Sequence, residues 1–239
     1  MREQILALVT LASTTLSVVS SAVGPLVSPV PEVQVLAEHT LDLGTRNKNP
    51  FVNEVFADNI LLALHYFKGD ADGFKLDPEK SGPGNINWEK VREPFESVLV
   101  LQAGEIFAFH GFLLREYQGL NVKTGKTKYT HSEGYKTVGG LPGNGVCHLA
   151  SLINWTASGA SLALDGESRR TGLEVVSKVN HNFLPVPGVP REFGTSIRYS
   201  PNGARNSQNQ NLYIRNNLGI PITFVFRANS SSVTLMIVQ

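Results

Sequence analysis

The chain has 239 residues, of which 41% are hydrophobic and 17% charged, the composition of an ordinary globular domain. It carries 21 basic and 20 acidic residues, so it lacks the excess of positive charge that neutralises the phosphates of a nucleic acid. A single cysteine, Cys147, excludes an internal disulfide and any zinc or iron–sulfur site built from several cysteines. We therefore expect a folded domain whose lone cysteine is either a small buried hydrophobe or a reactive group.

Residues 1–22 have the pattern of a secretory signal peptide. No charged residue occurs from position 5 to position 30, and Ser20, Ser21 and Ala22 are small residues of the kind that a signal peptidase reads. An uncleaved membrane anchor is an alternative, because about 18 apolar residues can span a bilayer; a buried N-terminal helix is another. The first two predict an exported protein, extracytoplasmic or anchored at the cell envelope, with no membrane contact except through an uncleaved N-terminal segment.

Three prolines at positions 25, 29 and 31 predict an extended linker after that segment. We expect residues 23–50 to be a linker and lead-in, and residues 51–239 to be one domain. The apolar spacing of 53–68 predicts a helix, with Asn53 as its cap and Gly69 after its end. Residues 69–87 read as a solvated loop. Its acidic residues Asp70, Asp72 and Glu79 lack the regular spacing of a calcium loop.

Short β-type runs occur on both sides of a second predicted helix. Residues 98–101 and 106–109 predict two strands around a turn, and apolar spacing from Leu149 to Ala160 predicts the helix. Further strands are expected at 173–176, 195–199, 212–214, 222–226 and 233–238. This order predicts an α+β fold, a few helices packed on a mainly antiparallel sheet, with a glycine-rich turn leading into a central helix.

Cys147 lies at the first turn of that central helix, directly after the glycine-rich turn 139–145. Unpaired N–H groups and the positive end of the helix dipole favour a thiolate over a thiol at such a position. Papain-like and transglutaminase-like enzymes place a nucleophilic cysteine in this way, with the base arriving later in the sequence. The alternative is a structural cysteine that fills a gap at the start of the helix.

A nucleophilic Cys147 would need a histidine base within reach of its sulfur. His181 is the best candidate, since it follows a predicted strand, and Glu192 or Asn182 would orient it. His148 is a poor direct base because neighbours on a helix diverge by about 100°. His110 and His131 are reserves. A zinc site is a further alternative, although the spacing of its ligands matches no compact pattern: Cys147, His110, His131 and His148.

The order of motifs resembles the VanW family, named for an accessory open reading frame in vancomycin-resistance clusters. The most specific match is the family's glycine-rich cysteine motif, at residues 143–151. Weaker matches are Asn59-Ile60 in the first helix and the segments 104–109, 133–136 and 214–222. The chain departs from the family motif in three places: Asn144 interrupts the glycines, His148 replaces a glutamine, and Ala150 replaces a serine.

Two functions follow as hypotheses. The leading one is an enzyme of the cell envelope that performs thiol-dependent acyl transfer or hydrolysis on cell-wall peptide. Cys147 would be its nucleophile, His181 its base and Glu192 the orienting acid. The oxyanion would be held at the turn formed by Gly143, Asn144, Gly145 and His148. The other hypothesis is a non-catalytic module that binds peptidoglycan or serves as a scaffold. Neither requires a cofactor or a metal.

Overall fold

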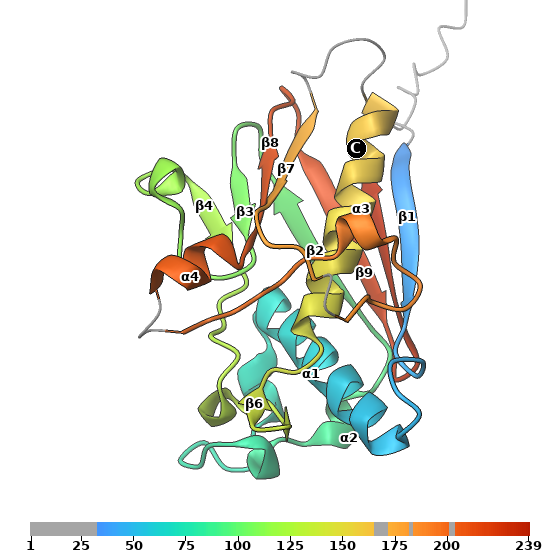
Figure 1. Ribbon diagram of the computed structural model, residues 1–239, viewed down its shortest axis with the longest axis vertical. Coiled ribbons are helices and arrows are strands. Elements are labelled where there is room, and N and C mark those ends of the chain that lie inside the picture. Colours follow the sequence, from blue (N-terminus) through green and yellow to red (C-terminus); the bar gives the residue numbers. More distant parts are fainter. Residues whose placement is uncertain (1–32, 165–171, 182–183, 201–203) are drawn as a thin grey trace, which may run out of the picture. The chain divides into compact units, whose positions relative to one another are not determined.

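The structure is a computed structural model that describes residues 33–164, 172–181, 184–200 and 204–239 (Figure 1). Residues Val33–Gln239 form one compact unit. The predicted signal peptide and most of the predicted linker, residues 1–32, lie outside the described residues. Within the described ranges, no helix is both long enough and apolar enough to cross a membrane.

The first sheet has four antiparallel strands in the order β1-β10-β9-β2. Its strands are β1 (Val35–Asp42), β2 (Phe95–Leu101), β9 (Ile222–Ala228) and β10 (Ser232–Val238). Burial alternates along the two central strands, where Phe224, Phe226 and Leu235 are fully buried. Because apolar residues alternate in the same way along the sequence, β9 and β10 could be predicted from it. The predictions for 222–226 and 233–238 are confirmed.

Strand β1 lies within residues 23–50, the predicted linker and lead-in, where no strand was expected. Leu36 and Leu41 are both buried, although regular alternation would put residues five positions apart on opposite faces. A register shift between Val35 and Ala37 in the pairing with β10 accommodates the additional residue. The bulge therefore conceals the pattern of a half-buried strand.

The second sheet has the order β4-β3-β8-β7, with β3 and β4 parallel and the other pairs antiparallel. Its strands are β3 (Ile106–Ala108), β4 (Val122–Thr124), β7 (Leu173–Ser177) and β8 (Leu212–Asn216). A short pair, β5 (Thr137–Val138) and β6 (Leu141–Pro142), precedes the glycine turn. The two sheets and the helices packed on them confirm the predicted α+β class.

The two sheets meet where β2 leads to β3 and β8 leads to β9. The fully buried Asn216 donates from Nδ2 to the carbonyl oxygens of Leu101, at 2.9 Å, and Ile220, at 2.8 Å. Its Oδ1 accepts from the N–H of Leu218 at 3.0 Å. One amide side chain thus ties the end of β2 to the turn after β8 and holds both crossings between the sheets in place.

Helix α1 (Pro50–Lys68) begins three residues before the predicted start. Its cap is Asn49, whose Oδ1 accepts from the N–H of Phe51 at 3.0 Å, so the prediction of Asn53 as the cap is wrong. Pro50 suits the first turn because that turn needs no N–H from it. The predicted end is confirmed, since Gly69 closes the helix in the left-handed conformation with φ 91°.

The loop after α1 contains short helices and ion pairs. It holds the 3₁₀ turns η1 (Ala71–Phe74) and η2 (Pro83–Asn85) and leads to α2 (Trp88–Val91). Asp70 pairs with Lys68 at 3.0 Å, and Asp72 pairs with Lys75 at 2.6 Å. Two of the three carboxylates considered for a calcium loop are therefore neutralised by lysines, as in a solvated loop.

Helix α3 (Val146–Leu164) is the central helix that the sequence predicted. It contacts β1 and β10 of the first sheet and β7 and β8 of the second, and it also packs on α1 (Figure 1). Leu149, Leu152 and Ile153 are fully buried at these contacts. The remaining helical segments are η3 (Arg115–Tyr117), η4 (His131–Glu133), η5 (Arg191–Phe193) and α4 (Ala204–Asn209).

The strand predicted at 195–199 is wrong, because this extended segment is not part of a sheet. The N–H groups of Thr195 and Ile197 donate to side chains on α3, whereas that of Ser196 donates to the carbonyl of Val179. The backbone N–H groups of this segment thus bond to several different elements and not to one neighbouring strand. The β-type composition correctly indicates an extended chain, but not the neighbour with which it pairs.

Candidate functional site

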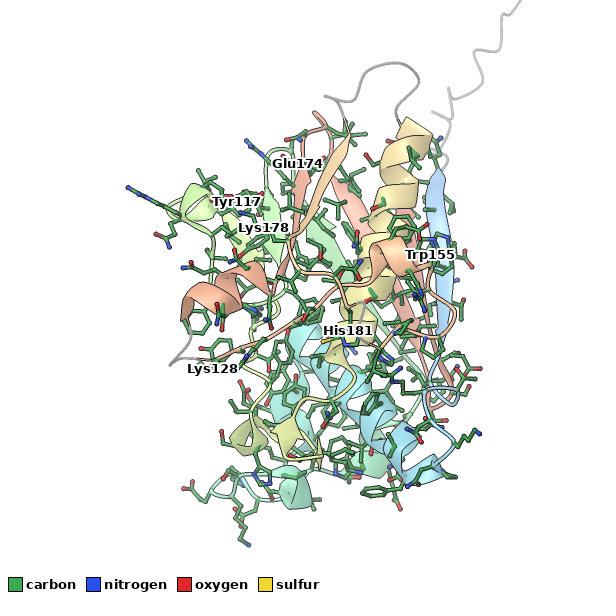
Figure 2. The ribbon with its side chains drawn as sticks, in the orientation of Figure 1. Tyr117, Lys128, Trp155, Glu174, Lys178 and His181 are labelled. Carbon is green, nitrogen blue, oxygen red and sulfur yellow. The ribbon has the colours of Figure 1, made fainter. Side chains whose placement is uncertain are left out.

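A cavity of about 680 Å³ lies at the start of α3. The glycine turn and first turn of α3 form one wall, and the segments around residues 128–130 and 197–200 form others. Figure 2 shows His181 near the start of α3 and Lys128 on the side toward α4, and both line the cavity. The predicted site residues that line it are Cys147, His181, Gly143, Asn144, Gly145 and His148.

The glycines of the turn are required by close packing. Gly145 has φ 103°, and a Cβ there would lie 2.7 Å from the carbonyl oxygen of Phe56 on α1. Gly143 has φ 73°, and a Cβ there would lie 2.9 Å from the Cβ of Tyr129. Both positions combine a left-handed backbone with a contact that leaves no room for a side chain. Packing alone therefore accounts for these two glycines.

An asparagine on α1 holds the turn from the other side. Asn59 is fully buried, and its Nδ2 donates to the carbonyls of Lys136 at 3.0 Å and Asn144 at 2.9 Å. Its Oδ1 accepts from the N–H of Lys136 at 2.8 Å. Asn144 in turn accepts from the N–H of Val138 at 2.8 Å. Asn59 was predicted only as a point of resemblance to the VanW family, although a polar residue on the apolar face of a helix indicates such a role.

The thiol of Cys147 is bound to the backbone of one residue. Its Sγ donates to the carbonyl of Ile197 at 3.6 Å and accepts from the N–H of Ile197 at 3.3 Å. Burial raises the pKa of Cys147, and the bond from Ile197 and the charge of Arg46 offset this only in part. The predicted thiolate at the start of the helix is thus opposed by desolvation, which favours the neutral thiol.

Cys147 is the first of three polar side chains that bind the extended segment along one side of α3. Ser151 Oγ accepts from the N–H of Thr195 at 2.9 Å. Asn154 Nδ2 donates to the carbonyl of Phe193 and to Oγ1 of Thr195, each at 3.0 Å. The spacing of four and then three residues places all three side chains on one face of the helix. Cys147 therefore contributes to a structural seam between α3 and residues 193–197.

The two histidines of the cavity are both disfavoured as cations. Burial lowers the pKa of His148 to about 3, assisted by Arg46 and His181. Burial also lowers the pKa of His181, with a further contribution from Arg46. Nδ1 of His181 lies 2.7 Å from the carbonyl of Leu184 and must donate to it, so the neutral ring leaves Nε2 as an acceptor. The ring centres of the two histidines are 6.2 Å apart.

The predicted triad is not assembled by hydrogen bonds. Within the described residues, the Cys147 sulfur bonds only to Ile197, and no bond joins it to His181. Glu192 is exposed on η5 and does not line the cavity. In the part of the chain that the structure describes, only its carbonyl takes part in a hydrogen bond, at 3.3 Å from Asn180 Nδ2. Asn182, the other candidate for orienting the base, lies outside the described residues.

The N–H groups proposed for an oxyanion site are partly occupied. The N–H of Val146 donates to Gly143 at 3.2 Å, and that of His148 donates to Gly145 at 2.8 Å. The N–H of Gly143 donates to the carbonyl of Lys136 at 3.3 Å, whereas, among the described residues, those of Asn144, Gly145 and Cys147 have no backbone partner. Of the four residues predicted to hold the oxyanion, only Asn144 and Gly145 therefore keep an N–H without a backbone partner.

Three cationic side chains line the cavity, and none of them was predicted from the sequence. Arg46, Lys128 and Arg198 contribute to the lining, and no aspartate or glutamate among the described residues does so. Arg46 donates from Nη1 to the carbonyl of Pro185 at 3.1 Å, and its Cζ lies 5.8 Å from the ring centre of Phe56. The cavity therefore has a positive electrostatic character that the near-zero net charge of the chain conceals.

The ligands of the alternative zinc site are not brought together. His110 is buried with both ring nitrogens bonded, Nε2 to the carbonyl of Gln210 at 3.0 Å and Nδ1 to the N–H of Phe112 at 3.3 Å. His131 is exposed on η4. Across the described ranges, no three side chains of histidine, cysteine, aspartate or glutamate form a group that could hold a metal ion.

Comparison with known proteins yields no relative: no family model, no curated protein and no solved structure matches the chain.

Proposed function

We propose that the protein is an exported, VanW-like module of the cell envelope that binds peptide-like ligands in the cavity at the start of α3 without a covalent step. The observation that carries the proposal is the cavity itself, whose lining combines three cations that form no salt bridge within the described residues with the side chains of Phe56 and Tyr199. The uncharged stretch from position 5 to position 30 supports export. The resemblance of residues 143–151 to the VanW motif supports the envelope as the site of action.

Binding is favoured over catalysis by the state of the thiol. A nucleophilic cysteine needs a thiolate and a base within hydrogen-bond reach. Here burial raises the pKa of Cys147, and the sulfur bonds to the backbone of Ile197. The cysteine and the two packed glycines then serve the architecture of the cavity.

The test is co-sedimentation of the purified protein with murein sacculi. We expect the wild-type protein and Cys147→Ser to sediment equally, because the serine hydroxyl can take over the contact with Ile197 and no covalent bond is needed. Sacculi stripped of their peptides by an amidase are the control and should not retain the protein. Failure of the wild-type protein to bind intact sacculi would refute the proposal.

Thiol-dependent acyl transfer or hydrolysis remains a second candidate, favoured by two observations. Cys147 and His181 line the same cavity, and His181 presents an unprotonated Nε2. In this reaction the sulfur would attack a peptide carbonyl to form a thioester, and His181 would pass the thiol proton to the departing amine. Mass spectrometry after incubation with murein peptides tests it: an acyl adduct on Cys147 supports the enzyme, and an unmodified cysteine with no cleavage products refutes it.

A further inference from the structure

His148 is a buried polar side chain whose partner is missing. It is 5% exposed and lines the cavity, and its Nε2 has no hydrogen-bond partner among the described residues. Its ring is held edge-on against Phe56, with ring centres 5.4 Å apart. Buried nitrogens are satisfied in the great majority of proteins, so this unpaired nitrogen calls for a partner, and the cavity that His148 lines has room for one.

Arg46 is a second group with unused donors at the same wall. One N–H of its guanidinium bonds to Pro185, and no carboxylate of the described residues lies within salt-bridge distance. The guanidinium is partly buried against Phe56. A planar guanidinium with free N–H groups matches the two oxygens of a carboxylate.

The start of α3 adds to this positive environment. The helix has 19 residues, and its first turn lines the cavity beside His148. Its macrodipole favours negative charge at this end, where the N–H groups of Gly145 and Cys147 lack backbone partners among the described residues. The arginine and the helix end thus both favour negative charge, and the neutral imidazole of His148 can add one hydrogen-bond donor.

We propose that this corner of the cavity binds the terminal carboxylate of a peptide-like ligand, with Arg46 and the Nε2–H of His148 as its donors. The inference rests on the proposed function and specifies which end of the ligand the cavity recognises. A neutral imidazole can donate one N–H to a carboxylate oxygen.

Calorimetric titration of the purified protein with N-acetyl-alanyl-alanine tests the inference, using the D and L forms and the C-terminal amide of each. We expect the free acid of one form to bind at least tenfold more tightly than its amide. Arg46→Gln should abolish this difference. Lys48→Gln is the matched control, because it removes an exposed cation two residues away that does not line the cavity, and it should preserve the difference.

His148→Met separates recognition from folding. It removes the unpartnered nitrogen and fills the space of the ring with an apolar side chain. We therefore expect weaker binding of the acid with no fall in the thermal midpoint of the free protein. Unchanged binding by this variant would overturn the role of His148. Equal binding of acid and amide by the wild type would overturn the carboxylate site but leave peptide binding intact. If neither dipeptide binds, the inference fails, and the sedimentation with sacculi decides the proposed function separately.

Discussion

Substitution of Asn59 by alanine tests whether this buried amide holds the wall of the cavity. The side chain makes three hydrogen bonds, to the N–H and the carbonyl of Lys136 and to the carbonyl of Asn144, at 2.8–3.0 Å. Each bond contributes about 1 kcal/mol net, and truncation also leaves buried backbone groups unpaired. We therefore expect Asn59→Ala to lower the free energy of unfolding by about 3 kcal/mol.

Urea unfolding of the purified protein measures this loss, with the free energy extrapolated to water at an unchanged dependence on urea. Asn53→Ala is the matched control on the same helix. Asn53 also makes three hydrogen bonds, to Asn47 and Gly44, but all three are exposed to solvent. Water replaces them, so we expect a loss of about 1 kcal/mol or less. Equal losses for the two variants would refute the view that Asn59 organises the turn.

Two further predictions concern the same wall. Burial lowers the pKa of His148 from 6.5 to about 3. Below pH 6.5 the unfolded chain therefore binds a proton that the folded protein does not bind, and the free energy of unfolding decreases as the pH is lowered. From pH 7 to pH 5 the wild type should lose about 2 kcal/mol more than His148→Met in urea unfolding; equal losses would show that the imidazole titrates normally. Gly145→Ala should destabilise the protein by more than about 2 kcal/mol, because it adds a clash with Phe56 to a strained backbone, whereas Gly139→Ala, with φ 65° but no neighbour within 4 Å, should cost less.

The regular elements were largely predictable because their patterns are local. Apolar periodicity and end signals predicted the helix that ends before Gly69, the central helix after the glycine turn and the strands β7–β10. The early start of α1 at Pro50 was missed because the predicted cap, Asn53, is itself inside the helix. Strand β1 was missed because a bulge disturbs its alternation.

The site was predictable only in part. The glycine turn placed Cys147 and His148 at the start of α3, and His181 reached the same cavity. Nothing in the sequence predicted that Ile197 would bind the sulfur, because this contact joins positions 50 residues apart through a segment that resembles a strand. Arg46 belongs to an irregular stretch without periodicity, so only the fold reveals that it faces the cavity.

The pH dependence of Cys147 alkylation tests the central claim most directly, namely that the cavity binds its ligand beside a neutral, structural thiol. The chain has a single cysteine, so iodoacetamide reports on one site without further mutations. Alkylation in urea is the control that shows the sulfur to be intact. We predict slow modification of the folded protein with an apparent pKa above the ~8.5 of a free thiol. Rapid modification with an apparent pKa of about 7 or below, the behaviour of a catalytic thiolate, would contradict the account.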